Sequence, residues 1–320
     1  MKKIFYYSVL IISGLTSFYS CNKDNSGAEQ ANEQKLLNAY LMANRGMYDS
    51  TVNKLYYIEK VKGTGPAVRY GDYVLVNYTG RLLADTNIIV DVTDTTLASA
   101  SKIYSISAFN GPVMLWTDDS SLLFSSGFRQ GLTLMNEGGK IRLIIQSKLG
   151  LGSYSTAVIP AYSTLIYDIE VVKVIKDPVA YDKEQVLDTL VKWGEGLADS
   201  ISGIYIKFDK PGVGESVEQY AGSGSGYTLR FYYSANLLNG NYIAGSRTDT
   251  IQLSAVLGST ALPFVGFLKM LDNMRLGSSA RVIIPYYYAY GSKILYNSYN
   301  QILVPYYSSL YFKITMTNIN

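Results

Sequence analysis

Tyrosine side chains are the most numerous groups in this chain that could take part in chemistry. The chain has 30 tyrosines, and Tyr286, Tyr287, Tyr288 and Tyr290 crowd into the stretch IIPYYYAYGS (283–292). Tyrosine fits the half-buried face of a strand, so a structural role is the simplest interpretation of most of them. Either this stretch is an apolar strand edge, or one of its phenols points into a site.

Other reactive groups are scarce, and this excludes several classes of function. The 320 residues contain no histidine, which removes Ser-His-Asp and Cys-His catalysis and imidazole zinc sites. Cys21 is the only cysteine, so an internal disulfide cannot form. The net charge of +3 is small and unclustered, which argues against a nucleic-acid partner. The acidic stretch DVTDTT (91–96) lacks the glycine and the spaced final acid of a calcium loop and is interpreted as a solvated loop.

The N-terminus explains the single cysteine. Lys2 and Lys3 precede the apolar run IFYYSVLIISGL (4–15), which is too short to span a bilayer. The run leads into TSFYSC, and this arrangement resembles a bacterial lipoprotein signal. The resemblance predicts that residues 1–20 are removed and that Cys21 carries the lipid, with the polar residues 22–32 as a flexible tether. The alternative is an ordinary signal peptide with an incidental cysteine.

The chain contains a duplication. The segment MNEGGKIRLIIQSKLGLGS (135–153) aligns with MRLGSSARVIIPYYYAYGS (274–292) at a constant offset of 139 residues. Upstream, SSGF aligns with FVGF, and downstream VIPAYSTLIYDIEVVKV aligns with LVPYYSSLYFKITMTNI. Two units of similar structure are therefore expected.

The elements within each unit follow from hydrophobic periodicity. Each unit begins with a helical pattern, at 36–41 in the first and after the Asp177-Pro178 start in the second. Alternating strands follow, then a short helix (128–138 and 267–277) that we expect glycine to close, and then two more strands. The pattern predicts an α+β fold with a curved antiparallel sheet on a short helix in each unit. The predicted boundaries are 1–20 for the signal peptide, 21–53 for the tether and N-terminal helix, 54–176 for the first domain, 177–202 for a linker helix and 203–320 for the second domain.

The motifs resemble those of a known family. Met-x-x-Gly, a basic and apolar strand, Ile-Pro-x-x-x-Ala-Tyr-Gly and a later apolar-Pro pair resemble the FKBP-type peptidyl-prolyl cis-trans isomerase domain, and GTGPAVRYGDYVLVNYTG (63–80) resembles its opening. The resemblance implies a binding site for proline-containing segments of proteins, with no cofactor, no metal and no covalent step. Tandem copies behind a lipoprotein signal resemble outer-membrane lipoproteins of the Bacteroidetes.

The resemblance also implies site residues in the second unit. Tyr290 takes the place of the tyrosine that binds the substrate carbonyl, and Phe267 takes that of the ring at the pocket floor. The other substrate-binding positions are Tyr233, Phe264, Val265, Val304 and Phe312. The family's Phe-Asp pair falls at Ile243-Ala244, so the acid is missing here.

The first unit keeps a different part of the site. Tyr78, Phe128, Ile159 and Tyr167 match the family pattern, and Asp91 keeps the acid. Leu151 replaces the carbonyl-binding tyrosine, so the second unit is expected to be the more active one. An insertion within 92–127 adds Phe109, Leu115, Trp116, Leu122, Leu123 and Phe124 near the pocket rim. We expect this insertion to contact a partner; the alternative is that it folds back on its own domain.

Three functions remain open from sequence alone. The first is a lipid-anchored isomerase and chaperone that assists the folding of exported proteins at the outer membrane, on a face that the sequence leaves open. The second is a catalytically degenerate binding subunit of an outer-membrane protein complex, with tyrosines at the interface. The third is glycan binding by exposed tyrosines, although the clustered acids and asparagines usual for such sites are missing. An isomerisation assay separates the first from the others.

Overall fold

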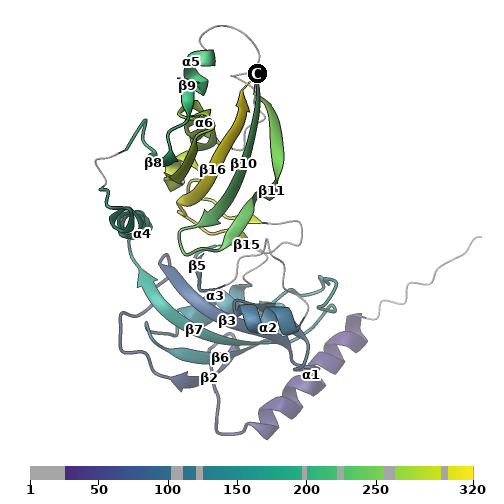
Figure 1. Cartoon of the computed structure of the whole chain (residues 1–320). Helices are drawn as coiled ribbons and strands as arrows, with labels where there is room; N and C mark the ends of the chain where they lie inside the picture. The colour runs from purple at the N-terminus through teal and green to yellow at the C-terminus, as the bar shows by residue number, and fades with distance from the viewer. Residues whose placement is uncertain are drawn as a thin grey trace, which may run out of the picture.

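Two sheet-bearing bodies, here called domain 1 and domain 2, make up the computed structural model (Figure 1). The structure describes residues 26–101, 111–119, 125–196, 200–221, 227–255, 264–296 and 302–319. Every pairing between neighbouring strands is antiparallel within this part of the chain. The predicted α+β fold with two antiparallel sheets, each preceded by a helix, is confirmed.

Domain 1 and its leading helix contain ten of the described elements. They are α1 (Ser26–Ala43), β1 (Asp49–Ser50), β2 (Tyr56–Val61), β3 (Tyr73–Leu82), β4 (Ile89–Val92), α2 (Thr95–Ala100), β5 (Val113–Trp116), α3 (Ser126–Leu132), β6 (Lys140–Ile145) and β7 (Leu165–Ile175). A 3-10 helix, η1 (Ser147–Leu149), follows β6.

Domain 2 also begins with a helix, and its main strands and short helix follow in the same order. Its elements are α4 (Pro178–Trp193), β8 (Tyr205–Lys210), β9 (Val213–Ser216), α5 (Val217–Ala221), β10 (Tyr227–Leu237), β11 (Tyr242–Ala255), α6 (Val265–Asp272), β12 (Arg275–Leu276), β13 (Ser279–Ile284), η2 (Tyr286–Tyr288), β14 (Leu295–Tyr296), β15 (Ile302–Val304) and β16 (Leu310–Ile319).

The strand order shows the duplication directly. Five strands of domain 1 run β2-β6-β7-β3-β4, and those of domain 2 run β8-β13-β16-β10-β11. The register agrees as well, because Gly80 pairs with both Asp91 and Tyr167, while Ala235 pairs with both Ala244 and Phe312. The structure therefore places Ala244 where domain 1 has Asp91, as the sequence alignment predicted.

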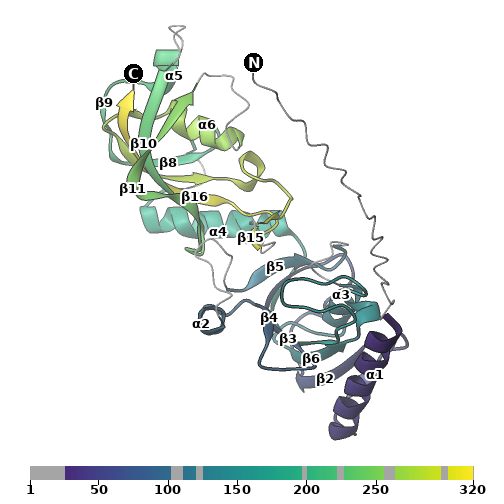
Figure 2. The ribbon, with the colours of Figure 1, turned by 90° about the vertical axis from the view of Figure 1, so that its right-hand side faces the viewer.

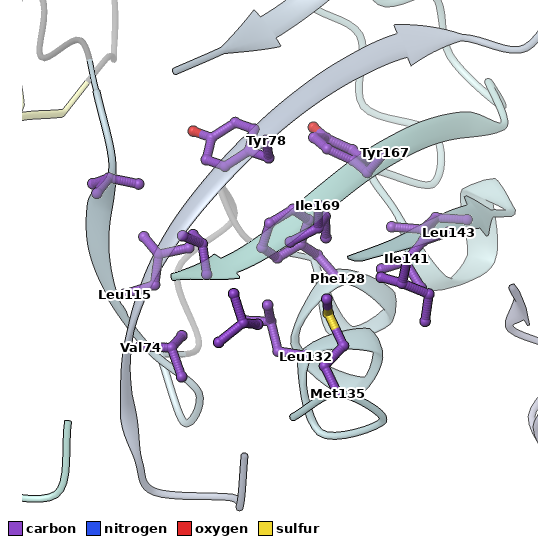
Figure 3. Close-up of a cluster of buried hydrophobic side chains, with 14 of the residues drawn as sticks. Val74, Tyr78, Leu115, Phe128, Leu132, Met135, Ile141, Leu143, Tyr167 and Ile169 are labelled. Carbon is purple, nitrogen blue, oxygen red and sulfur yellow. The ribbon is translucent and has the colours of Figure 1, made fainter. Parts of the chain in front are cut away.

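Alternating burial along the strands creates one core in each domain. Along β3 every second residue is buried, as expected for a strand with one face on the core. The inward side chains of domain 1 include Val74, Val76 and Tyr78, which pack with α3 (Figure 3). The same arrangement gathers Phe231, Phe267 and Phe312 in domain 2.

The short helices lie very close to their sheets because of a glycine. A Cβ atom on Gly127 of α3 would meet Ile145 at 2.7 Å, and one on Gly266 of α6 would meet Ile284 at 2.2 Å. The two glycines occupy equivalent positions in the duplicated pattern, and each places the following phenylalanine against the core. Both helices are shorter than predicted and end at Leu132 and Asp272, so glycine does not close them.

The described part of the insertion contains the short helix α2 and the strand β5, which joins domain 1's own sheet. β5 pairs with β3 from Tyr73↔Trp116 to Val76↔Val113, and Leu115 is buried in the domain 1 core. The prediction that the apolar side chains of this insertion serve a partner is wrong for β5, which packs within its own domain. Phe109, Leu122, Leu123 and Phe124 lie outside the described residues.

The helices α1 and α4, which precede the two sheets, differ from the predictions in part. α1 already begins at Ser26, so the flexible tether predicted for 22–32 is wrong from that residue onward. Asp177 caps α4 as predicted, since its carboxylate accepts hydrogen bonds from the N–H groups of Val179 and Ala180. Val186 and Leu190 form the buried face of this helix, whereas Val191 is exposed.

A carboxylate on each of these helices fastens it to its domain, which sequence patterns did not suggest. Glu33 of α1 accepts hydrogen bonds from the Ser147 N–H and hydroxyl, both at 2.6 Å, and from the Thr164 hydroxyl at 2.7 Å. Asp182 of α4 accepts from the Ser309 N–H at 2.9 Å and from its hydroxyl at 2.6 Å. Glu33 thus holds the loop between β6 and β7, and Asp182 holds the corresponding loop between β13 and β16.

We expect Asp182 to make stability depend on pH. Burial raises the pKa of its carboxyl from 3.8 to about 6, although hydrogen bonds from Ser309 oppose the shift. Because the folded state binds the proton more tightly, the free energy of unfolding falls as pH rises from about 4 to about 6, by at most about 3 kcal/mol. Asp182→Asn removes this step in denaturant titrations at several pH values. The matched control Asp188→Asn, at an exposed position of the same helix, leaves it unchanged.

The interpretation of Tyr286, Tyr287 and Tyr288 as residues of a strand edge is wrong, because they form the 3-10 helix η2. Their rings extend a row of aromatic contacts that crosses the domain boundary. The row runs from Trp116 through Tyr73, Tyr307, Tyr286 and Tyr287 to Tyr288, with centroid separations of 4.8–6.1 Å. The row crosses between the domains at the contact of Tyr73 with Tyr307, and Tyr286, Tyr287 and Tyr288 extend it within domain 2.

The predicted export signal, with Cys21, lies outside the described residues. Within the described residues, no helix is long and apolar enough to cross a membrane.

Candidate functional site

Three aromatic rings converge in domain 1 from three different elements. Tyr78 of β3, Phe128 of α3 and Tyr167 of β7 have centroids 5.0–6.0 Å apart and meet edge to face. Figure 3 shows the two tyrosines on neighbouring strands above Phe128. Ile159 is buried in the same apolar cluster. The structure thus brings together all four of the apolar residues predicted for this pocket.

Asp91 is the polar group of the domain 1 cluster. The Tyr78 hydroxyl donates to its carboxylate at 2.8 Å, and the Val92 N–H donates to its other oxygen at 2.8 Å. Burial raises the pKa of Asp91, and these two hydrogen bonds limit the rise. Burial and the nearby Asp91 charge raise the pKa of Tyr78 well above its usual value. Tyr78 therefore remains a neutral donor held by Asp91.

Domain 2 assembles an equivalent cluster with more rings. Tyr233, Phe267 and Phe312 have centroids 5.7–6.0 Å apart, in the positions of Tyr78, Phe128 and Tyr167. Phe264 adds a fourth wall, 6.0 Å from Phe267. Val304 is fully buried in the same core. These contacts create an apolar aromatic surface of the kind that could hold a small ring.

Tyr290 lies at the edge of this surface. Its ring meets that of Phe264 at 5.1 Å, and its hydroxyl has no hydrogen-bond partner among the described residues. Burial raises the pKa of Tyr290, so it keeps its proton near neutral pH. Domain 1 has Leu151 at the equivalent place, because both residues follow a 3-10 helix closed by the same hydrogen bonds (Gly152 N to Ser147 O, and Gly291 N to Tyr286 O, each 2.8 Å).

One predicted residue does not join the cluster. Val265 is 62% exposed at the first position of α6, because the helix turns its next residues, Gly266 and Phe267, toward the sheet. Phe264, just before the helix, faces the rings instead. The prediction that Val265 lines the pocket is therefore wrong.

The two clusters differ in access. In domain 1, Tyr78 is 7% exposed, Phe128 2% and Tyr167 8%, so the cluster is covered. In domain 2, Tyr233, Phe264 and Tyr290 remain half-buried around the buried Phe267. Among the described residues, the domain 2 cluster is thus the more accessible of the two.

A separate groove of about 470 Å³ lies on the other side of the domain 1 sheet. Four of its charged side chains are paired with one another, Lys60 with Asp168 at 2.7 Å and Lys140 with Glu170 at 3.3 Å. Within the residues that the structure describes, no group of three or more metal-binding side chains is present. The aromatic clusters are therefore the better candidates for a site.

The paired sheets and their aromatic clusters agree with the comparison to known families. The model of the FKBP-type peptidyl-prolyl cis-trans isomerase family matches residues 65–172 and 221–317, more than half of the chain. The chain belongs to the FKBP-type peptidyl-prolyl cis-trans isomerase family, of which it carries two tandem domains.

Individual relatives are more distant. A probable FKBP-type peptidyl-prolyl cis-trans isomerase of Haemophilus influenzae is 30% identical over 154 residues, which cover 48% of this chain and 56% of that protein. FkpA of Escherichia coli K12 is 28% identical over 141 residues, covering 44% and 45%. The chain thus spans about half the length of the curated relatives it matches. Among solved structures, the three FKBP domains of wheat FKBP73 cover 87% of this chain and 97% of theirs at 18% identity, with a TM-score of 0.29.

Proposed function

We propose that the chain is a lipid-anchored prolyl isomerase and chaperone for exported proteins, and that domain 2 carries the activity. The observation behind this proposal is the half-open cluster in which Phe267 lies below Tyr233, Phe264 and Tyr290. A prolyl ring needs an apolar surface of this kind, and its carbonyl neighbour needs a donor.

The chemistry requires no nucleophile or metal. Rotation about a peptide bond has a barrier of roughly 18–20 kcal/mol because of its partial double-bond character. Phe267 and Phe264 would hold the prolyl ring away from water, and the neutral Tyr290 hydroxyl would donate to the carbonyl of the twisting amide. Each ~1.4 kcal/mol of preferential stabilisation accelerates exchange tenfold.

The experiment is an isomerisation assay with the full-length protein and a short Leu-Pro peptide. Acceleration above the uncatalysed rate, which takes tens to hundreds of seconds, supports the enzyme. No acceleration at micromolar protein favours the second candidate, a degenerate binding subunit. The closed, tyrosine-bearing domain 1 with Leu151 at the donor position is the feature that favours this second candidate.

The membrane anchor has its own test. Cys21 follows an apolar run and is the only thiol, so Cys21→Ser is expected to move the protein from the membrane fraction to the soluble fraction. Immunoblots of fractionated cells measure this, with Ser20→Ala, next to the cysteine, as the matched control. Continued membrane association of Cys21→Ser would contradict lipidation at this residue.

A further inference from the structure

Part of the cover over the domain 1 cluster comes from domain 2. Ile302 of β15 is 7% exposed and belongs to the buried core of domain 1, the one that contains Tyr78, Phe128 and Tyr167. Ile294 and Tyr296 pack against the same core. Tyr296 lies near enough to Tyr78 for its charge to raise the Tyr78 pKa. Figures 1 and 2 both show β15 at the boundary between the two domains.

The hairpin of β14 and β15 faces both domains at once. Ile294 and Tyr296 contact the core of domain 1, whereas Leu295 between them contacts the core of domain 2. Along β15, Ile302 enters domain 1 and Val304 enters domain 2. Neighbouring strand residues point to opposite faces, which explains how β14 serves two cores. On β15, Ile302 and Val304 are two residues apart and would share a face in a regular strand, but the pairing of β15 with β14 is irregular between these two positions.

The loop that carries the hairpin is longer than its counterpart in domain 1. The offset between the two copies is 139 residues before it and 145 residues after it, so domain 2 carries six additional residues here. In domain 1 the equivalent loop exposes Tyr154 and Val158 and reaches no second core. The stretch that is longer in domain 2 thus leads into Ile302, which enters domain 1, whereas Leu303 and Val304 align with Val158 and Ile159 of domain 1.

Polar and aromatic contacts hold the base of the hairpin in place. The Tyr306 hydroxyl donates to the Asp119 carboxylate at 2.8 Å. The Tyr73 ring meets the rings of Tyr306 and Tyr307 edge to face, at 5.8 and 5.4 Å. These contacts fix the direction in which Ile302 enters domain 1.

We propose that the β14–β15 hairpin is a built-in occupant of the domain 1 pocket, and that its displacement opens a second binding site for apolar proline-containing peptides. The rings and Asp91 that the family pattern requires are assembled in the core that the hairpin enters, and among the described residues the hairpin is the part of domain 2 that packs against them. That the opened pocket takes a proline peptide rests on the proposed function, whereas its occupation by Ile302 does not.

The test uses the full chain with isotope-labelled isoleucine methyl groups. In the wild type, the Ile302 methyl should show nuclear Overhauser contacts to the rings of domain 1. A short Leu-Pro peptide should shift the signal of Ile243 in domain 2 but leave Ile159 in domain 1 unchanged. Missing Ile302 contacts, or an Ile159 shift in the wild type, would overturn the proposal.

Ile302→Ser should then open the site. Losing one buried isoleucine corresponds to about ten- to hundredfold in the closed-to-open ratio, so the peptide should now shift Ile159 with an affinity raised by that factor. Leu303→Ser, a neighbouring aliphatic residue that contacts domain 2, is the matched control and should leave Ile159 silent.

A second variant covers the case in which Ile302→Ser fails to fold. Tyr306→Phe keeps the ring and removes only the bond to Asp119, so a smaller opening, about three- to tenfold, is expected. If Ile159 stays silent in both folded variants while Ile243 responds, the hairpin is packing only and the proposal is wrong. If Ile243 never responds, the proposed function fails, while the Ile302 contacts still decide whether the hairpin occupies the pocket.

Discussion

Phe267→Ala is expected to lower kcat/KM for proline isomerisation by about hundredfold. The ring lies at the centre of the domain 2 cluster, within 6.2 Å of Phe231, Tyr233, Phe264 and Phe312. Its loss removes the surface on which a prolyl ring would lie, and burying a side chain of this size contributes up to about 3 kcal/mol. A protease-free assay with a fluorogenic Leu-Pro peptide measures the effect in the full-length protein.

Tyr290→Phe separates catalysis from folding. It keeps the ring contact with Phe264 and removes only a hydroxyl that has no partner among the described residues, so stability should not change. Loss of one hydrogen bond in the transition state should lower kcat by about three- to tenfold, with little change in KM. Tyr287→Phe, at a 57% exposed position of the same loop, is the matched control. Unchanged kcat in Tyr290→Phe would remove the phenol from the mechanism.

Glu33→Ala is expected to have the largest effect on stability. Its carboxylate accepts three hydrogen bonds of 2.6–2.7 Å from Ser147 and Thr164, which lie 114 and 131 residues away in the chain. Hydrogen bonds to a charged group contribute about 1.5–3 kcal/mol each when removed singly, and because these act together we expect a loss of about 2–4 kcal/mol. Denaturant unfolding of the full chain measures this loss.

Two further variants make the Glu33 result specific. Glu29→Ala, at an exposed position of the same helix, should leave the free energy of unfolding within about 0.5 kcal/mol of the wild-type value. Glu33→Gln keeps one acceptor oxygen and should fall between the two. If Glu33→Ala unfolds like Glu29→Ala, the carboxylate does not fasten α1 to domain 1.

The sequence by itself determined the repeat, the order of the elements and most of the aromatic residues of both clusters. These properties are carried by local patterns. The period of two is visible within a short segment, and the offset of 139 residues appears when short segments are aligned with one another. The structure then showed that these equivalent positions also pair alike, Gly80 with Asp91 and Ala235 with Ala244.

The tertiary structure alone decided which residues pack over the aromatic cluster of domain 1. The burial of Tyr78 by a hairpin from the other domain depends on how two bodies pack, and no local pattern encodes a contact between Tyr306 and Asp119, 187 residues apart. The exposure of Val265 depends in the same way on the rotation of α6 against its sheet. Each outcome depends on the total apolar area that residues far apart in the chain bury together. A single sequence lists those residues but does not show which of them are in contact.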